Sequence, residues 1–204
     1  MQEAVGRDRP SEVYDNAPAI IRKILVFPYA DGFRFVQALY VGGGYDTVDG
    51  AFRNPPQSTE QILHPSMYQQ GRGPTTVTLA ASEAITSAGW VVEDEDTMGE
   101  FFIRTWFEEA MNSGEASAAA AGWGGDRYRL FRDAAGRYAL GAMTVWDTPR
   151  DAEEFEKALK RYVDEGLPVG MKSRVARSGA EVRLAVAPDE NTLALLLEGL
   201  NTAS

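Results

Sequence analysis

The sequence predicts an α+β fold, a helical N-terminal half packed with a small antiparallel sheet covered by helices. Two observations predict it. Apolar residues recur every three to four positions in the first half, as on a helix face. The last third instead contains two pairs of β-rich segments, each followed by a helical pattern. The order strand-strand-helix-strand-strand-helix favours helices lying on one face of the sheet.

We divide the chain of 204 residues into three regions. Residues 1–16 are polar and charged, and we expect a flexible N-terminal segment without the apolar stretch of a signal peptide. Residues 17–121 form the mostly helical region. Residues 122–204 form the sheet with its helices, and they can share one core with the helical region.

The helical region begins with residues 17–45, interrupted at Phe27-Pro28-Tyr29 because proline disfavours a helical residue before it. Asp31 can cap a second helix. One face of that helix is expected to carry Phe33, Val36, Leu39 and Tyr40. The triplet Gly42-Gly43-Gly44 ends it, and a short helix is expected over 46–52.

Three further patterns follow before residue 122. Ser58 with Gln61 fits a capping box, and so does Thr97 with Glu100 at the start of a helix over 97–111. Residues 75–79, four of which are β-branched, predict a strand, and residues 89–92 predict a second short one. The acidic run 93–96 is expected to be solvated, because it lacks the glycine and distant glutamate of a calcium loop.

The sheet region is predicted to contain strands at 126–132 and 137–146, and again at 172–176 and 181–186. Thr148 caps the helix that follows the first pair, and Asp189 caps the last helix. Both helices have an apolar stripe that the sheet can bury.

Composition excludes several classes of function. With one histidine, His64, and no cysteine, the chain cannot supply the ligands of a structural or catalytic zinc site, and no metal or cofactor is expected in it. The net charge of −10 argues against nucleic-acid binding, which needs a basic surface. No apolar run is long enough to span a membrane.

His64 and Glu60 form the first candidate site. They stand four residues apart, so on a helical turn they lie on one side, where the carboxylate can tune the pKa of the imidazole or both can orient a substrate. The alternative is a capped turn between two proline stops, with His64 bonded to a backbone group.

The second candidate site is the glycine-rich segment 121–128. Trp123, Asp126, Arg127 and Tyr128 can form the wall of a binding cleft for a peptide or small ligand. The alternative is a structural corner that joins the sheet to the helices. The segment lacks the lysine of a phosphate-binding loop and the spacing of a dinucleotide motif.

Five motifs in this order resemble a known family. They are Phe27-Pro28-Tyr29-x-x-Gly32-x-x-Phe35-Val36, Gly43-Gly44-Tyr45, Pro55-Pro56-Gln57-Ser58-Thr59-Glu60-Gln61-Ile62-Leu63-His64-Pro65, Gly122-Trp123-Gly124-Gly125-Asp126-Arg127-Tyr128 and Trp146-Asp147-Thr148. The chain is similar, over about residues 17–159, to the C-terminal part of mostly uncharacterised bacterial extracytoplasmic proteins described as candidate zinc metallopeptidases.

The resemblance implies a zinc-binding His-Glu-x-x-His helix upstream of the part seen here, which this chain lacks. It therefore implies a non-catalytic C-terminal region that completes a substrate cleft or core, with an upstream domain or a peptide-like ligand as partner. His64, supported by Glu60, is expected to face that zinc site in an auxiliary role. The alternative is a free-standing binding module without catalysis. A third hypothesis, an enzyme using carboxylates and His64, is ranked lowest.

Overall fold

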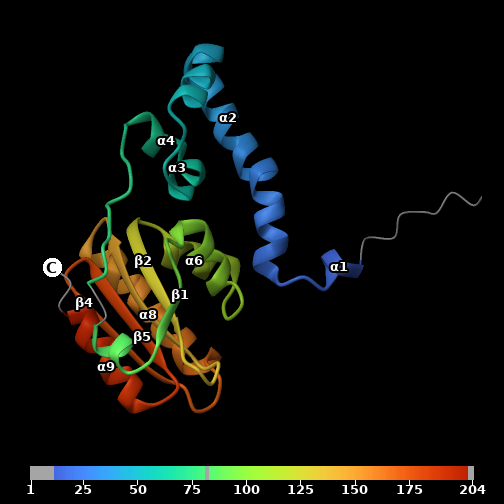
Figure 1. The fold of residues 1–204 in the computed structure, drawn as a ribbon. Helices are drawn as coiled ribbons and strands as arrows, with labels where there is room; N and C mark the ends of the chain where they lie inside the picture. Colours follow the sequence, from blue (N-terminus) through green and yellow to red (C-terminus); the bar gives the residue numbers. More distant parts are fainter. Residues whose placement is uncertain (1–11, 81–82, 202–204) are drawn as a thin grey trace, which may run out of the picture.

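The computed structural model of the protein describes residues 12–80 and 83–201 and confirms the α+β class. A five-stranded antiparallel sheet in the order β1-β2-β3-β5-β4 forms its centre. The strands are β1 (Val91–Asp96), β2 (Trp123–Arg132), β3 (Tyr138–Trp146), β4 (Lys172–Ser178) and β5 (Glu181–Ala187). Helix α8 (Pro149–Gly166) follows β3 and α9 (Glu190–Asn201) follows β5, so the predicted element order of the last third is confirmed (Figure 1).

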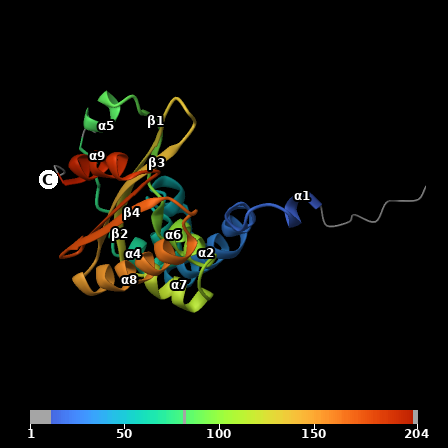
Figure 2. The ribbon, with the colours of Figure 1, turned by 90° about the horizontal axis from the view of Figure 1, so that it is seen from below.

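Helices cover both faces of the sheet, and the prediction of one covered face is wrong. Helices α6 (Gly99–Phe107), α7 (Ser113–Ala120) and α8 lie on one side, and α5 (Glu83–Ser87) and α9 lie on the other (Figure 2). The end of β5, Leu184–Ala187, is buried at every position. Such a continuous apolar run is typical of a strand covered on both faces.

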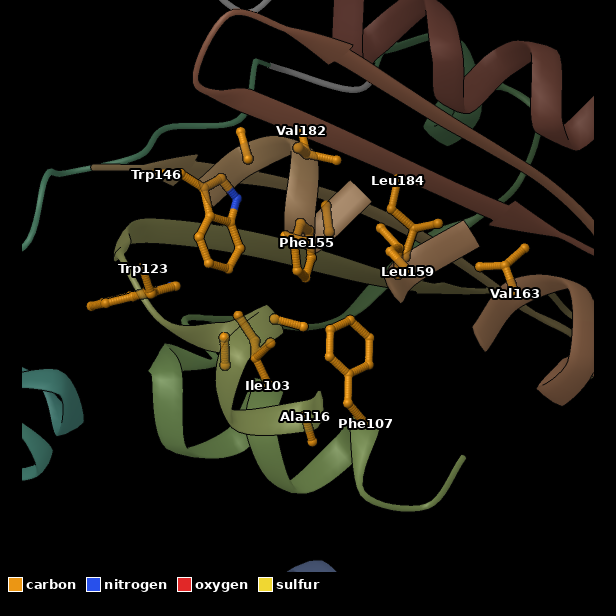
Figure 3. Close-up of a cluster of buried hydrophobic side chains, with 14 of the residues drawn as sticks. Ile103, Phe107, Ala116, Trp123, Trp146, Phe155, Leu159, Val163, Val182 and Leu184 are labelled. Carbon is orange, nitrogen blue, oxygen red and sulfur yellow. The ribbon is translucent and has the colours of Figure 1, made fainter. Parts of the chain in front are cut away.

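The larger core lies between the sheet and helices α6, α7 and α8 (Figure 3). Phe155 of α8 stacks on Trp146 with ring centroids 4.4 Å apart, and Phe107 of α6 lies 5.6 Å from Phe155. Because α6 and α7 precede residue 122, the helical region and the sheet region share this core. Strand β1 also precedes residue 122 and forms one edge of the sheet.

The remaining helices are α1 (Glu12–Asp15), α2 (Ala19–Arg53), α3 (Thr59–Leu63) and α4 (Pro65–Gln69). The predicted break at Pro28 is wrong: α2 runs through it, although a proline inside a helix forfeits one backbone hydrogen bond. The predicted stop at the glycines is a kink, where Gly44 has φ of 68° and ψ of −156°. The hydroxyl of Thr47 bonds the Leu39 carbonyl across this kink at 2.7 Å.

One short segment differs from its prediction and one agrees with it. Residues 75–79 form no strand, because a single backbone bond, from Thr75 N to Gly124 O, joins them to β2. The acidic run 93–96 is mostly exposed, as predicted; it is part of edge strand β1, and arginines of β2 pair with Glu93 and Glu95. The predicted flexible segment 1–16 lies mostly outside the described residues.

Candidate functional site

Residues of five helices surround a cavity of about 470 Å³ that His64 lines. Helix α2 contributes Asp31 and Arg34, the α3–α4 corner contributes residues 62–65, α6 contributes Glu100 and Arg104, and the end of α7 contributes residues 117, 118 and 121. The cavity thus lies where the helical arm meets the helices that cover the sheet.

Local sequence fixes the position of His64. Ser58 caps α3 by accepting a bond from Gln61 N, which confirms half of the predicted capping box. The amide of Gln61 binds Gln57 N and Arg72 O instead of reaching back to Ser58. Because Pro65 starts α4 directly after α3, His64 sits at the corner between the two helices, with its side chain about half exposed.

Glu100 is the side-chain partner of His64. The Nε2 atom of His64 lies 2.9 Å from Oε1 of Glu100, whose side chain is almost fully buried. This bond, together with the negative charges of Glu100 and Glu60, raises the pKa of His64 against the opposing effect of burial. Nδ1 of His64 has no partner in the part of the chain that the structure describes, so the protonated ring keeps one donor free.

The predicted capping box of Thr97 and Glu100 is wrong, which is why the sequence did not single out Glu100. The hydroxyl of Thr97 donates to the Asp126 carbonyl, and the carboxylate of Glu100 turns to His64. Helix α6 is capped from β2 instead, by the side chain of Asp126.

Glu60 influences His64 through its charge and not through a side-chain bond. Its carboxyl is buried in α3, and burial, followed by the charges of Asp147 and Glu100, raises the pKa of Glu60 to about 7. Arg72, which pairs with Asp147 at 3.2 Å, reduces that shift. The pKa values of Glu60 and His64 are thus both raised, and neighbouring groups with shifted pKa values are often found at functional sites.

The second predicted site is built mainly as a structural corner. Trp123 and Asp126 are buried, and the carboxylate of Asp126 accepts bonds from Met98 N, Gly99 N and the Trp123 indole, all within 2.9 Å. Burial still raises the pKa of Asp126, against the effect of the three donors. The conformation of Gly99, with φ of 75°, completes this tight approach of α6 to β2.

Arg127 and Tyr128 have partners on β1. Arg127 binds Glu95 at 3.1 Å, and the hydroxyl of Tyr128 donates to Asp94. Burial and this bond raise the pKa of Tyr128 to about 12. Trp123, Asp126 and Arg127 nevertheless line a second cavity, of about 410 Å³, together with residues 57–59, 74–77 and 97–99. The two candidate sites are thus separate cavities that share no lining residue.

A metal site is not formed by the described residues, since no three His, Cys, Asp or Glu side chains there are grouped to hold an ion. None of the helices in residues 12–80 and 83–201 is long and apolar enough to cross a membrane.

Comparison with known proteins gives one match. The model of a family called "Domain of unknown function (DUF8575)" matches residues 89–197, which is more than half of the chain and extends from the start of β1 into α9. Glu100 and the Trp123–Tyr128 segment lie within the match, whereas His64 and α2 lie before it. No curated protein and no solved structure matches the chain.

Proposed function

We propose a function for this chain, which belongs to the DUF8575 family of unknown function: it is a non-catalytic region that docks onto a zinc-metallopeptidase-like catalytic domain and completes its substrate cleft. The observation that carries the proposal is the exposed apolar face of α2. The choice of partner rests on the resemblance of the motifs between residues 17 and 159 to the C-terminal part of such proteins.

Helix α2 has two apolar sides. One side, with Phe35 and Leu39, is buried against α3, α4 and α6. The other side carries a stripe at helical spacing that is between 44% and 80% exposed and consists of Leu25, Tyr29, Phe33, Val36 and Tyr40. Figure 1 shows α2 standing apart from the sheet, beyond α3, α4 and α6. A helix that is apolar on both sides is typical of one buried on both sides.

The exposed apolar residues are concentrated on this one element. Eleven of the seventeen exposed large hydrophobic side chains among the described residues belong to α2. Isolated exposed apolar residues are common on soluble proteins, but a contiguous stripe marks an interaction surface. We therefore place the docked domain against this stripe.

His64 gives the docked assembly a second contact. Its raised pKa favours the protonated ring, and its free Nδ1–H lies in a cavity beside α2, where it can donate a hydrogen bond to a substrate oxyanion. The catalytic domain would supply zinc, which polarises the scissile carbonyl and activates water. Glu100 fixes the ring, and Glu60 acts on it by charge. The resemblance also implies an extracytoplasmic location for this assembly.

The experiment is a binding measurement against the domain encoded upstream. The genomic sequence in frame before Met1 is read first, and an encoded domain with a His-Glu-x-x-His helix is expressed separately. Its affinity is compared for the wild-type chain, for a Tyr29→Ser/Phe33→Asp double variant, and for Val169→Asp, a control at a fully exposed apolar position away from α2.

The proposal predicts binding to the wild-type chain and to the control. The affinity of the double variant should be lower by at least about 100-fold, because each buried aromatic side chain contributes about 1.5–3 kcal/mol. Equal binding of all three chains, or no such domain in the genome, contradicts the proposal. Self-association of the isolated chain through α2, detected by light scattering, would assign the stripe to a second copy and also contradict it.

A second candidate function is a binding module that uses the cavity at Trp123, Asp126 and Arg127. The volume of about 410 Å³ favours it, because small-molecule pockets have volumes of about 300–1,000 Å³. We rank it second, since the polar groups of these three side chains already have partners within the protein. Saturable binding of a ligand that is abolished by Arg127→Ala would favour it over docking.

A further inference from the structure

Two charged side chains in the His64 cavity have a buried atom without a partner. They are Oε2 of Glu100 and Nε of Arg104, and neither bonds any group among the described residues. Both residues line the cavity and lie one turn apart on the same face of α6. A buried polar atom without a hydrogen bond is costly, so two of them at one cavity indicate groups that a ligand satisfies.

The other charges around the cavity are already paired. Oε1 of Glu100 is bonded to His64, Arg34 is paired with Asp31 at 3.0 Å, and Lys23 is paired with Glu108. Among the described residues that line the cavity, Arg104 is therefore the positively charged side chain that has no carboxylate partner. Its guanidinium lies 6.0 Å from the centre of the Phe101 ring.

The positive charge of Arg104 acts on two neighbouring groups. After burial, it is the second cause that lowers the pKa of Lys23, a residue of α2. The positive charge of Arg104 likewise opposes the protonation of His64. An anionic group bound to Arg104 relieves both repulsions.

The two unpartnered atoms have opposite requirements. Nε of Arg104 donates and needs an acceptor, for which a carboxylate is the strongest match. Oε2 of Glu100 accepts and needs a donor. One kind of ligand that meets both has a carboxylate and an N–H on the neighbouring carbon atom. Inorganic phosphate offers acceptors and O–H donors but no N–H, and a neutral amide lacks the charge.

We propose that the cavity binds the carboxylate end of an α-amino acid or of a peptide, with the carboxylate on Arg104 and the α-nitrogen on Glu100. The remaining wall is formed by small and apolar side chains that can contact a side chain of the ligand: Ile62, Leu63, Pro65, Ala118 and Ala121. The cavity of about 470 Å³ is large enough for a small ligand. This inference deepens the proposed function and rests on it in taking a peptide end as the natural ligand.

The test is a titration of the isolated chain, followed by ¹H–¹⁵N NMR, with four probes. N-acetyl-L-alanine offers the carboxylate and an amide N–H, L-alanine offers the carboxylate and an ammonium, propionate lacks the nitrogen, and N-acetyl-L-alanine amide lacks the carboxylate. The proposal predicts saturable shifts at α6 and the α3–α4 corner for the first or the second probe. Tighter binding of N-acetyl-L-alanine identifies a peptide end as the natural ligand, and tighter binding of L-alanine identifies a free amino acid.

The other two probes are predicted to bind at least about tenfold more weakly, because each lacks one charge-assisted hydrogen bond. Arg104→Gln is predicted to reduce the affinity for N-acetyl-L-alanine or L-alanine by about tenfold or more. Arg161→Gln, at an exposed position on α8, is the matched control and is predicted to leave it unchanged.

Glu100→Gln tests the α-nitrogen contact, and its NMR spectrum reports whether the chain still folds. If it does not fold, the comparison of propionate with N-acetyl-L-alanine decides the same point on the wild-type chain. An absence of saturable shifts, or equal affinities for wild type and Arg104→Gln, overturns the proposal and leaves water as the partner of both atoms. Because no second domain is present, this result is independent of the docking measurement.

Discussion

Replacement of Glu60 by glutamine tests the electrostatics of the His64 region. Burial and two neighbouring carboxylates raise the pKa of Glu60 from 4.5 to about 7. The folded protein therefore binds the Glu60 proton more tightly than the unfolded chain does. Its contribution to stability is fully present below the unfolded pKa and is lost as the pH rises through 7. Glutamine resembles the protonated carboxyl and should not lose this stability.

The shift sets the size of the effect. At about 1.36 kcal/mol per pKa unit, the shift corresponds to at most about 3 kcal/mol at pH 8. Water in the adjoining cavity screens the charges, and we expect about 1–2 kcal/mol. At pH 5 the same relation gives about a quarter of that difference. The Glu60→Gln variant should thus be clearly more stable than wild type at pH 8 and nearly equal to it at pH 5.

The assay is urea unfolding followed by circular dichroism at pH 5 and pH 8 and at constant ionic strength. Glu109→Gln, a change at an exposed carboxylate, is the control and should show no such difference between the two pH values. His64 also has a raised pKa, so some loss of stability above its unfolded pKa should remain in the Glu60→Gln variant. A variant that is equal to or less stable than wild type at pH 8 would refute the reasoning.

Three more substitutions test the fold. Asp126→Ala removes the acceptor of three buried donors and should lower the free energy of unfolding by about 2–4 kcal/mol. Urea unfolding measures this value, and a loss below about 1 kcal/mol would contradict the role of Asp126 in capping α6. Gly125→Ala places a Cβ 2.3 Å from the Thr75 carbonyl oxygen and should displace residues 74–77. The displacement should appear as NMR shift changes confined to residues 74–77 and β2, and an unchanged spectrum would contradict the close approach of the two backbones. Phe155→Ala opens a cavity in the larger core and should destabilise the protein by about 3–5 kcal/mol in the same unfolding assay, with a value near zero as the contrary result.

The sheet and its two following helices were predictable because their signals are local. Strand alternation, a glycine turn and the Thr148 cap are readable within a few residues, and the structure has Thr148 accepting from Asp151 N as expected. The number of sheet faces that helices cover depends on which distant segments pack on the sheet. The sequence does not show this packing, and the structure does. Likewise, Pro28 predicted a break in the helix. In the structure α2 continues through Pro28, and Phe27 and Phe35 on either side of it pack on rings of α6 and α4.

The candidate site was only partly predictable. His64 and Glu60 stood out because the chain has one histidine and a helical spacing between them. Glu100 is 36 residues away from His64, and its position after Thr97 favoured a local capping role. Nothing in the sequence near Thr97 shows that Asp126, 29 residues later, caps this helix in its place. Tertiary pairing of this kind has no short-range signal.

The exposed stripe of α2 is the centre of this account, and amide hydrogen exchange tests it most directly. Exchange in residues 25–41 is measured by mass spectrometry for the chain alone and for the chain mixed with the proposed catalytic domain. The account predicts that the domain slows exchange along α2 by more than about tenfold and leaves the core of β2 and β3 unchanged. Unchanged exchange along α2 in the presence of that domain would contradict docking on this face.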